Sequence, residues 1–260
     1  MSTVRNPARE RLERGEVSLG LGIRQRRSVD IAKILKTSGY DWLFLDLEHG
    51  TMSLDTASQI SVAALDAGIA PIVRVPAMQH AMATRALDGG ALGIVVPHVD
   101  SAREAREIVD HLKYPPAGHR SVSGAQPQFD YRAMKIGELT AELNAATLTV
   151  VMVETPKAIA NVDAIAAVPG VDVVLIGTND LAAEMGIAGD FANPKIAAAY
   201  KKVIAACGKH KKFPGMGGVY SEDLMKKYVG MGMRMILGGG DVGMLMQAAS
   251  QRASFLRACL

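Results

Sequence analysis

The chain has 260 residues, of which 49% are hydrophobic and 21% charged, with a formal net charge of +3 and two cysteines. This length suits one large domain or two small ones, and the mild, dispersed charge argues against a nucleic-acid partner. The sequence offers no disulfide framework, CxxC metal motif, signal-peptide core or run of about 18 apolar residues to span a membrane, so we expect a soluble cytoplasmic protein without a membrane partner.

Short apolar runs recur along the chain, rich in Val, Ile and Leu and without strict alternation, as is typical of parallel strands covered on both faces. We predict strands at 18–23, 42–48, 70–76, 93–99, 147–154, 171–177, 213–218 and 233–239. Helical patterns separate them: Ser101 begins one with a capping box, and Gly68 ends another. Eight strands that alternate with helices predict a single (β/α)8 TIM barrel over residues 1–260. The alternative, an open doubly wound sheet, lacks its GxGxxG motif.

Two segments exceed what a minimal barrel needs. Residues 114–146 form a long connection with a polar, loop-like stretch, and a connection of this length is usually functional or packs against a partner subunit. A C-terminal helix is predicted at about 241–259. Its apolar face carries Val242, Leu245, Met246, Ala249 and Leu256.

Polar side chains gather where the predicted strands end. The strand bodies are almost free of charge, and active sites of TIM barrels lie at the C-terminal ends of the strands. The residues at or just past those ends are Asp46, Glu48, His49, Arg74, His98, Glu154, Asn179 and Asp180. This distribution predicts one polar site at the mouth of the barrel.

Several of these residues also have simpler explanations. Asp46 and Arg74 could form a buried ion pair, Asp180 could be a helix N-cap, and His98 a structural histidine. Glu154 is harder to explain, because it directly follows TVVMV, and a buried carboxylate without a cation is costly or must become protonated. Glu154 and Asp180 on adjacent strand ends suit Mg²⁺ or a similar hard divalent ion with open positions for substrate.

Other barrel chemistries lack their residues. No strand end carries a lysine, and the remote Lys157 is the one candidate for Schiff-base chemistry. No GxSxG motif supports a serine hydrolase. Glycines at 215–218 and 238–241 could cradle a phosphate, as in barrel isomerases, or only allow close backbone approach. Neither role accounts for Glu154 and Asp180.

Five motifs occur along the chain in a recognisable order and spacing: DWLFLDLEHG, VRVP, YPPAGHRSV, VMVETPKAIANVDAIAAVPGVDVVLIGTNDLAAEMG and the late GGGD. From about residue 17 to 250 they resemble the HpcH/HpaI family of metal-dependent (class II) pyruvate aldolases. The resemblance implies a (β/α)8 barrel, usually a hexamer built as a dimer of trimers, whose last helix is swapped between subunits. It also implies reversible cleavage of 4-hydroxy-2-oxo acids, such as sugar acids, to pyruvate and an aldehyde, with Mg²⁺, Mn²⁺ or Co²⁺ as cofactor.

The resemblance assigns roles in catalysis by position. Glu154 and Asp180 correspond to metal ligands, and His49 to the catalytic base or its proton relay. Asp88 resembles the carboxylate that raises the basicity of that histidine. Asp46 is expected to support the site by orienting a neighbouring side chain.

The resemblance also assigns the substrate contacts. Arg74 corresponds to the residue that stabilises the enolate, and Asn179 and Asp180 lie where the keto acid is held. Met152 stands where the family commonly has Gln, and it should border the pocket because it shares a strand face with Glu154. The turn after the first strand has Arg24, Arg26 and Arg27 where the family's best-known members carry an aromatic residue. One of them, expected to be Arg24, could receive a distal carboxylate of an acceptor or a substrate, whereas at least two are expected to be solvated charges around a helix start.

Related activities remain as alternatives. A malyl- or citramalyl-CoA type lyase of the same superfamily would need a longer basic surface for its nucleotide, and only residues 24–27 hint at one. Oxaloacetate decarboxylation would pass through the same enolate. A barrel kept only for binding or assembly would show a decayed site, whereas every charged position is kept and Met152 is the one change. Glu48 has no role at this level.

Overall fold

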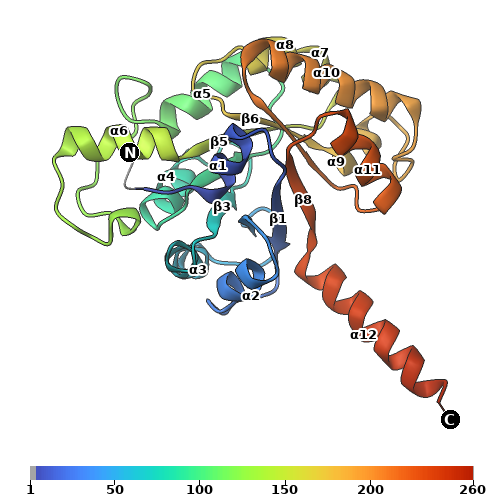
Figure 1. Cartoon of the computed structure of the whole chain (residues 1–260). Helices are drawn as coiled ribbons and strands as arrows, with labels where there is room; N and C mark the ends of the chain where they lie inside the picture. The colour runs from blue at the N-terminus through green and yellow to red at the C-terminus, as the bar shows by residue number, and fades with distance from the viewer. Residues whose placement is uncertain (1–3, 260) are drawn as a thin grey trace.

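The computed structural model describes residues 4–259, which fold into a closed barrel of parallel strands hydrogen-bonded in chain order (Figure 1). The strands are β1 Ser18–Ile23, β2 Trp42–Asp46, β3 Ala70–Arg74, β4 Gly93–Val96, β5 Leu148–Val153, β6 Val173–Gly177, β7 Phe213–Gly217 and β8 Met235–Gly240. Each strand overlaps its predicted run. The (β/α)8 prediction is therefore confirmed.

Helices connect the strands and surround the barrel. They are α1 Pro7–Glu13, α2 Ile31–Thr37, α3 Leu54–Ala67, α4 His80–Asp88, α5 Ala102–Leu112, η1 Pro127–Phe129 (3₁₀), α6 Ile136–Ala146, α7 Pro156–Ala160, α8 Val162–Ala166, α9 Thr178–Glu184, α10 Pro194–His210, α11 Glu222–Met231 and α12 Asp241–Arg257. The predicted caps are present: the Ser101 side chain accepts the N–H of Glu104, and Gly68 ends α3 at φ 69°. No helix among the described residues is long and apolar enough to cross a membrane.

Strand side chains alternate between two apolar layers. Trp42 and Phe44 point into the barrel, whereas Leu43 and Leu45 belong to the layer under the helices. A Cβ at Gly20 would overlap the Trp42 indole, so glycine leaves the room that this ring fills. The interior is thus packed at the end where the strands begin.

The N-terminal segment reinforces that packed end. Asn6, the N-cap of α1, donates from Nδ2 to the carbonyl oxygens of Leu92 and Ala146, at 2.9 and 2.8 Å. These carbonyls lie just before β4 and β5, and Leu12 of α1 packs in the inner layer. A ligand therefore has to enter at the opposite, C-terminal end of the strands.

The two extra segments differ in what they pack against. Residues 114–146 contain irregular chain followed by η1 and α6, and Phe129, Leu139 and Leu143 bury their side chains in the inner layer of the same chain. The predicted C-terminal helix is confirmed as α12, which extends away from the barrel (Figure 1). Within the described residues, no side chain of α12 is buried, and Leu245 is 71% exposed.

Candidate active site

A cavity of about 880 Å³ lies at the C-terminal ends of the strands. Its walls come from strand ends, from the loops that follow β1, β2 and β7, and from the first turns of α9 and α12. The predicted site residues that line it are Arg24, His49, Arg74, Met152, Asn179 and Asp180. The structure thus brings most of the predicted site together in one chamber.

Asp46 is the centre of the polar network beside the cavity. It pairs with Arg74 in the register of β2 and β3, and its two oxygens accept from Arg74 Nε and Nη2 at 3.0 and 2.7 Å. It also accepts the backbone N–H groups of Glu48 and His49 and the Nε of Arg24. Burial alone would raise the pKa of Asp46, but the hydrogen bonds and charge of Arg74 lower it below its ordinary value. Asp46 is therefore both an ion-pair partner and the residue that orients its neighbours.

Glu48, which had no role at the sequence level, holds the other edge of Arg74. Its Oε2 lies 2.9 Å from Arg74 Nη1, and its Oε1 lies 3.7 Å from His98 Nε2. The guanidinium carbon of Arg74 lies 5.0 Å from the ring centre of Phe44. Held by two carboxylates and an aromatic face, Arg74 has little rotational freedom.

Glu154 is almost completely buried, with 1% of its surface exposed. Its Oε1 accepts the backbone N–H of His98 at 2.7 Å and lies 3.2 Å from Nδ1 of the same residue. Burial, together with the charges of Asp180 and Glu48, raises the pKa of Glu154 to about 7 despite these contacts with His98. At neutral pH the positive charge that the chain supplies therefore leaves this carboxylate only partly ionised.

The surroundings of Glu154 fit a hard divalent cation. Its Oε2 occupies space next to Gly177, where any Cβ would overlap it. Asp180 in the first turn of α9 lines the adjoining cavity and acts on Glu154 as a second negative charge. Two neighbouring carboxylates beside an open chamber form an oxygen donor set of the kind that Mg²⁺ and Mn²⁺ prefer.

His98 was treated as a structural histidine at the sequence level, and the structure places it at the site instead. Its backbone has a left-handed φ of 56°, uncommon for a residue other than glycine, and in this conformation its N–H reaches Glu154. Its imidazole lies between Glu48 and Glu154. In the sequence, only the position of His98 near the end of the fourth predicted strand indicated that it could contact Glu154 and Glu48.

His49 lines the cavity with about half of its side chain exposed. The structure does not bring its expected partner Asp88 to it within one chain. Asp88 ends α4, which runs back to the start of β4 at the opposite end of the barrel, and its carboxylate accepts from Arg120 Nη2 at 2.6 Å. Two other carboxylates lie near His49. Asp46 accepts the backbone N–H of His49, and Oε2 of Glu48 lies 4.0 Å from its Nε2.

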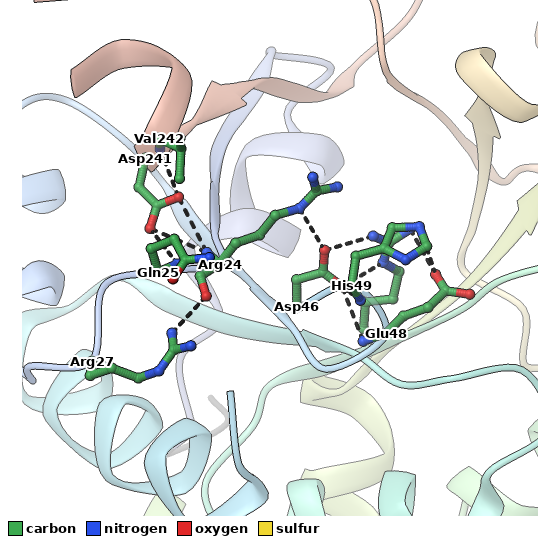
Figure 2. A network of polar contacts seen from close by, with 9 residues as sticks. Arg24, Gln25, Arg27, Asp46, Glu48, His49, Asp241 and Val242 are labelled. Carbon is green, nitrogen blue, oxygen red and sulfur yellow. Dashed lines mark hydrogen bonds and ion pairs between the residues drawn. The ribbon is translucent and has the colours of Figure 1, made fainter. Parts of the chain in front are cut away.

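Asp241, the first residue of α12, organises the loop after β1 (Figure 2). Its carboxylate accepts the backbone N–H groups of Arg24, Gln25 and Arg26, the latter two at 2.9 Å, and that of Val242. Burial would raise the pKa of Asp241, but these N–H groups lower it. The sequence drew attention to this residue only through the GGGD motif, without a role.

The arginines of this loop have different environments. Arg26 pairs with Asp30, and Arg27 donates to the carbonyl oxygen of Arg24 and to Thr51. Arg24 alone of these three lines the cavity, where its Nε donates to Asp46 at 3.0 Å. Figure 2 shows its two terminal nitrogens pointing away from Asp46. The chamber therefore has a cationic group on the wall formed by the β1 loop.

Comparisons with known proteins agree with this geometry. Residues 25–248 match the HpcH/HpaI aldolase/citrate lyase family. A 4-hydroxy-4-methyl-2-oxoglutarate aldolase from Hapsidospora irregularis is 41% identical over 92% of this chain and 90% of its own, and a hydroxypyruvate/pyruvate aldolase from Paraburkholderia phytofirmans is 34% identical over 99% and 100%. The crystal structure of an HpcH/HpaI aldolase from Desulfitobacterium hafniense has a TM-score of 0.91 at 30% identity and covers 96% of each chain. The chain belongs to the HpcH/HpaI aldolase/citrate lyase family.

Proposed function

We propose that this protein is a divalent-metal-dependent pyruvate aldolase, a carbon–carbon lyase that cleaves a 4-hydroxy-2-oxo acid and catalyses the reverse aldol addition. The observation that carries the proposal is the buried Asp46–Arg74 pair, with Glu154 close enough for its charge to act on Arg74 and Asp180 close enough to act on Glu154. Arg74 and Asp180 both line the cavity. A fixed guanidinium next to a cation site is what an enolate intermediate needs. Relatives that cover nearly the whole chain are aldolases.

Glu154 and Asp180 would hold Mg²⁺, Mn²⁺ or Co²⁺, with open positions for the carboxylate and keto oxygen of the substrate. When bound, the cation would act as a Lewis acid on that ketone. Asn179, beside Asp180 at the start of α9, would contribute to holding the 2-oxo acid.

The side chains of the protein would then carry the proton and the charge. His49 takes the proton of the C4 hydroxyl, the C3–C4 bond breaks, and C4 becomes a carbonyl while C3 retains the electron pair in an enolate. Arg74, fixed by Asp46 and Glu48, stabilises the developing negative charge. Protonation of C3 completes pyruvate.

Arg24 supports a substrate with a second carboxylate. Its two terminal nitrogens point away from Asp46, and they would bind a carboxylate on C4 in a bidentate contact. This property fits 4-hydroxy-4-methyl-2-oxoglutarate, the substrate named for the relative from Hapsidospora irregularis, whose cleavage yields two pyruvate molecules. Met152, which lines the same chamber, offers an apolar surface where the family commonly has an amide.

An acyl-CoA substrate finds less support. Of the arginines in the loop after β1, Arg26 is paired with Asp30 and Arg27 contacts the backbone, so they do not form an extended basic surface for a nucleotide. Solved citrate lyase structures resemble the chain at 16% identity, which reflects the fold alone. Oxaloacetate decarboxylation would use the same enolate and would accompany the aldolase reaction as a side activity.

The C-terminal helix supports assembly with further copies of this chain. Leu245, Met246, Phe255 and Leu256 are each more than half exposed on α12. Isolated helices with this much bare apolar surface are marginal in water, and packing against a partner stabilises them. A swapped α12 in a hexamer, as the family resemblance implies, would bury these side chains.

The function is tested by measuring pyruvate release with three substrates: 4-hydroxy-4-methyl-2-oxoglutarate, oxaloacetate and citramalyl-CoA. The protein is assayed after treatment with a chelator and again after addition of Mg²⁺ or Mn²⁺. The proposal predicts that the hydroxy-oxo acid is the best substrate and that its cleavage requires the added metal. Preference for the acyl-CoA, or full activity in the presence of chelator, would contradict it.

A further inference from the structure

Three potential metal ligands lie close together outside the barrel, on the neighbouring helices α4 and α5. Nε2 of His80 lies 3.3 Å from Oε1 of Glu107. The imidazole of His111 stacks on that of His80, with ring centres 4.1 Å apart and planes inclined by 16°. One nitrogen or oxygen of each side chain lies within 4.8 Å of the others. None of the three residues takes part in the cavity.

The helices place these residues together for clear reasons. Glu107 and His111 are four residues apart on α5, so they project from the same face one turn apart. His80 is the first residue of α4, which packs beside α5.

A hydrogen bond between His80 and Glu107 explains only part of this arrangement. It does not involve His111, which stacks on the same imidazole and brings a further ring nitrogen to the cluster. A cation bound by two ring nitrogens and one carboxylate oxygen accounts for all three side chains. Ring nitrogens bind a cation in the plane of the ring, so His111 would turn out of the stack to share an ion with His80. The side chains of His111 and Glu107 are exposed, the latter by 41%, which leaves them free to turn.

We propose that His80, Glu107 and His111 form a second metal site, which takes Zn²⁺ or a similar transition-metal ion and ties α4 to α5. Two imidazole nitrogens and one carboxylate are ligands that suit Zn²⁺, with water at a fourth position reached from solvent. The site therefore differs in chemistry from the all-oxygen pair Glu154 and Asp180. Its cation stabilises the helix pair and takes no part in the aldol reaction.

The test is calorimetric titration of tag-free, chelator-treated protein with Zn²⁺ in excess Mg²⁺, which competes for the carboxylates of the cavity. We expect about one Zn²⁺ per chain and a rise of the melting temperature on binding. His111→Ala and Glu107→Gln should each weaken binding about tenfold or more, since even changes outside the ligand shell cost 10–100-fold. His119→Ala, an exposed histidine beside Asp110, is the matched control and should bind as the unaltered protein does.

A further variant separates this site from the proposed aldolase site. Glu154→Gln should retain zinc binding in excess Mg²⁺, because the outer ligands are intact. The proposal is overturned if the unaltered protein binds no Zn²⁺ under these conditions. It is equally overturned if His111→Ala binds Zn²⁺ with full affinity, or if Glu154→Gln abolishes binding.

Discussion

Asp46 and Arg74 stand directly opposite each other in the register of β2 and β3, and two hydrogen bonds join their buried side chains beside the cavity. A buried guanidinium is costly without a partner, so the pair must form together as the two strands align. The same carboxylate also accepts hydrogen bonds from the backbone N–H of His49 and from Nε of Arg24. One residue thereby positions the proposed base, the proposed enolate-stabilising group and the proposed substrate-binding arginine.

The first prediction concerns this pair. Asp46→Asn removes the charge that compensates Arg74, so we expect a stability loss of about 3 kcal/mol and a fall in kcat/KM of about 100-fold. Urea unfolding and pyruvate release measure the two effects. Asp30→Asn makes the same change in the exposed pair with Arg26 and should leave the stability almost unchanged, because solvent screens an exposed ion pair. Equal urea midpoints for Asp46→Asn and Asp30→Asn would contradict the role given to the pair.

The pH dependence of stability follows from the lowered pKa of Asp46. Its ordinary pKa is about 3.9, so the carboxylate is ionised in both states above about pH 5, and its stabilising contribution is complete there. As the pH falls below 3.9 toward the lower pKa of the folded state, the unfolded state takes up the proton first and this contribution is lost. The stability difference between the unaltered protein and Asp46→Asn should therefore be constant above about pH 5 and shrink in acid. A difference that grows as the pH falls would have the wrong sign.

The Gly177 position tests the space beside Glu154. Gly177→Ala should displace the carboxylate, because the added Cβ would overlap Oε2, and a displacement of this kind lowers kcat/KM by about 100-fold. Gly208→Ala is the matched control, since a Cβ on this residue of α10 meets nothing within 4 Å. Pyruvate release at saturating Mg²⁺ is the measurement. Full activity of Gly177→Ala would show that Glu154 does not need its present position.

Arg24 is predicted to favour substrates that carry a carboxylate on C4. Arg24→Gln should raise the KM for 4-hydroxy-4-methyl-2-oxoglutarate about tenfold or more, because a charge-assisted hydrogen bond contributes roughly 1.5–3 kcal/mol. The KM for 4-hydroxy-2-oxopentanoate, which lacks the second carboxylate, should change little. Arg26→Gln, in the same loop but paired with Asp30, serves as control. An equal rise in KM for both substrates would show that Arg24 does not recognise the second carboxylate.

The apolar face of α12 is predicted to carry the assembly. Leu245→Glu combined with Leu256→Glu places charges on two side chains that are 71% and 56% exposed in the single chain. Light scattering should show a smaller particle for this variant with an unchanged barrel by circular dichroism. Gln251→Glu on the same helix should keep the mass of the unaltered protein. If the unaltered protein is itself a monomer, the proposed assembly is wrong.

The sequence predicted the fold and most of the chamber because both follow local rules. Apolar runs such as 42–48 form buried strands, and parallel strands bring polar residues at their ends to one mouth. That logic located Glu154 and Arg74 without knowledge of any contact. It also placed Met152 on the cavity wall, where the structure has it.

What the sequence could not predict depends on contacts between distant segments and on backbone shape. Asp88 matched a family spacing, but the return path of α4 carries it to the far end of the barrel in a single chain. His98 reaches Glu154 through a left-handed backbone, which no pattern of side chains reveals. Asp241 joins the loop after β1 from more than 200 positions away along the chain.

The most direct test of the account is Mn²⁺ binding and pyruvate release by Glu154→Gln, a nearly isosteric change that still accepts the N–H of His98. We predict that this variant binds Mn²⁺ at least about 100-fold more weakly and releases no pyruvate at any metal concentration, because it removes one of two ligands. Glu107→Gln, at the outer site, should cleave the substrate normally. Unchanged turnover by Glu154→Gln after chelation and metal addition would contradict the proposed metal-dependent aldolase site.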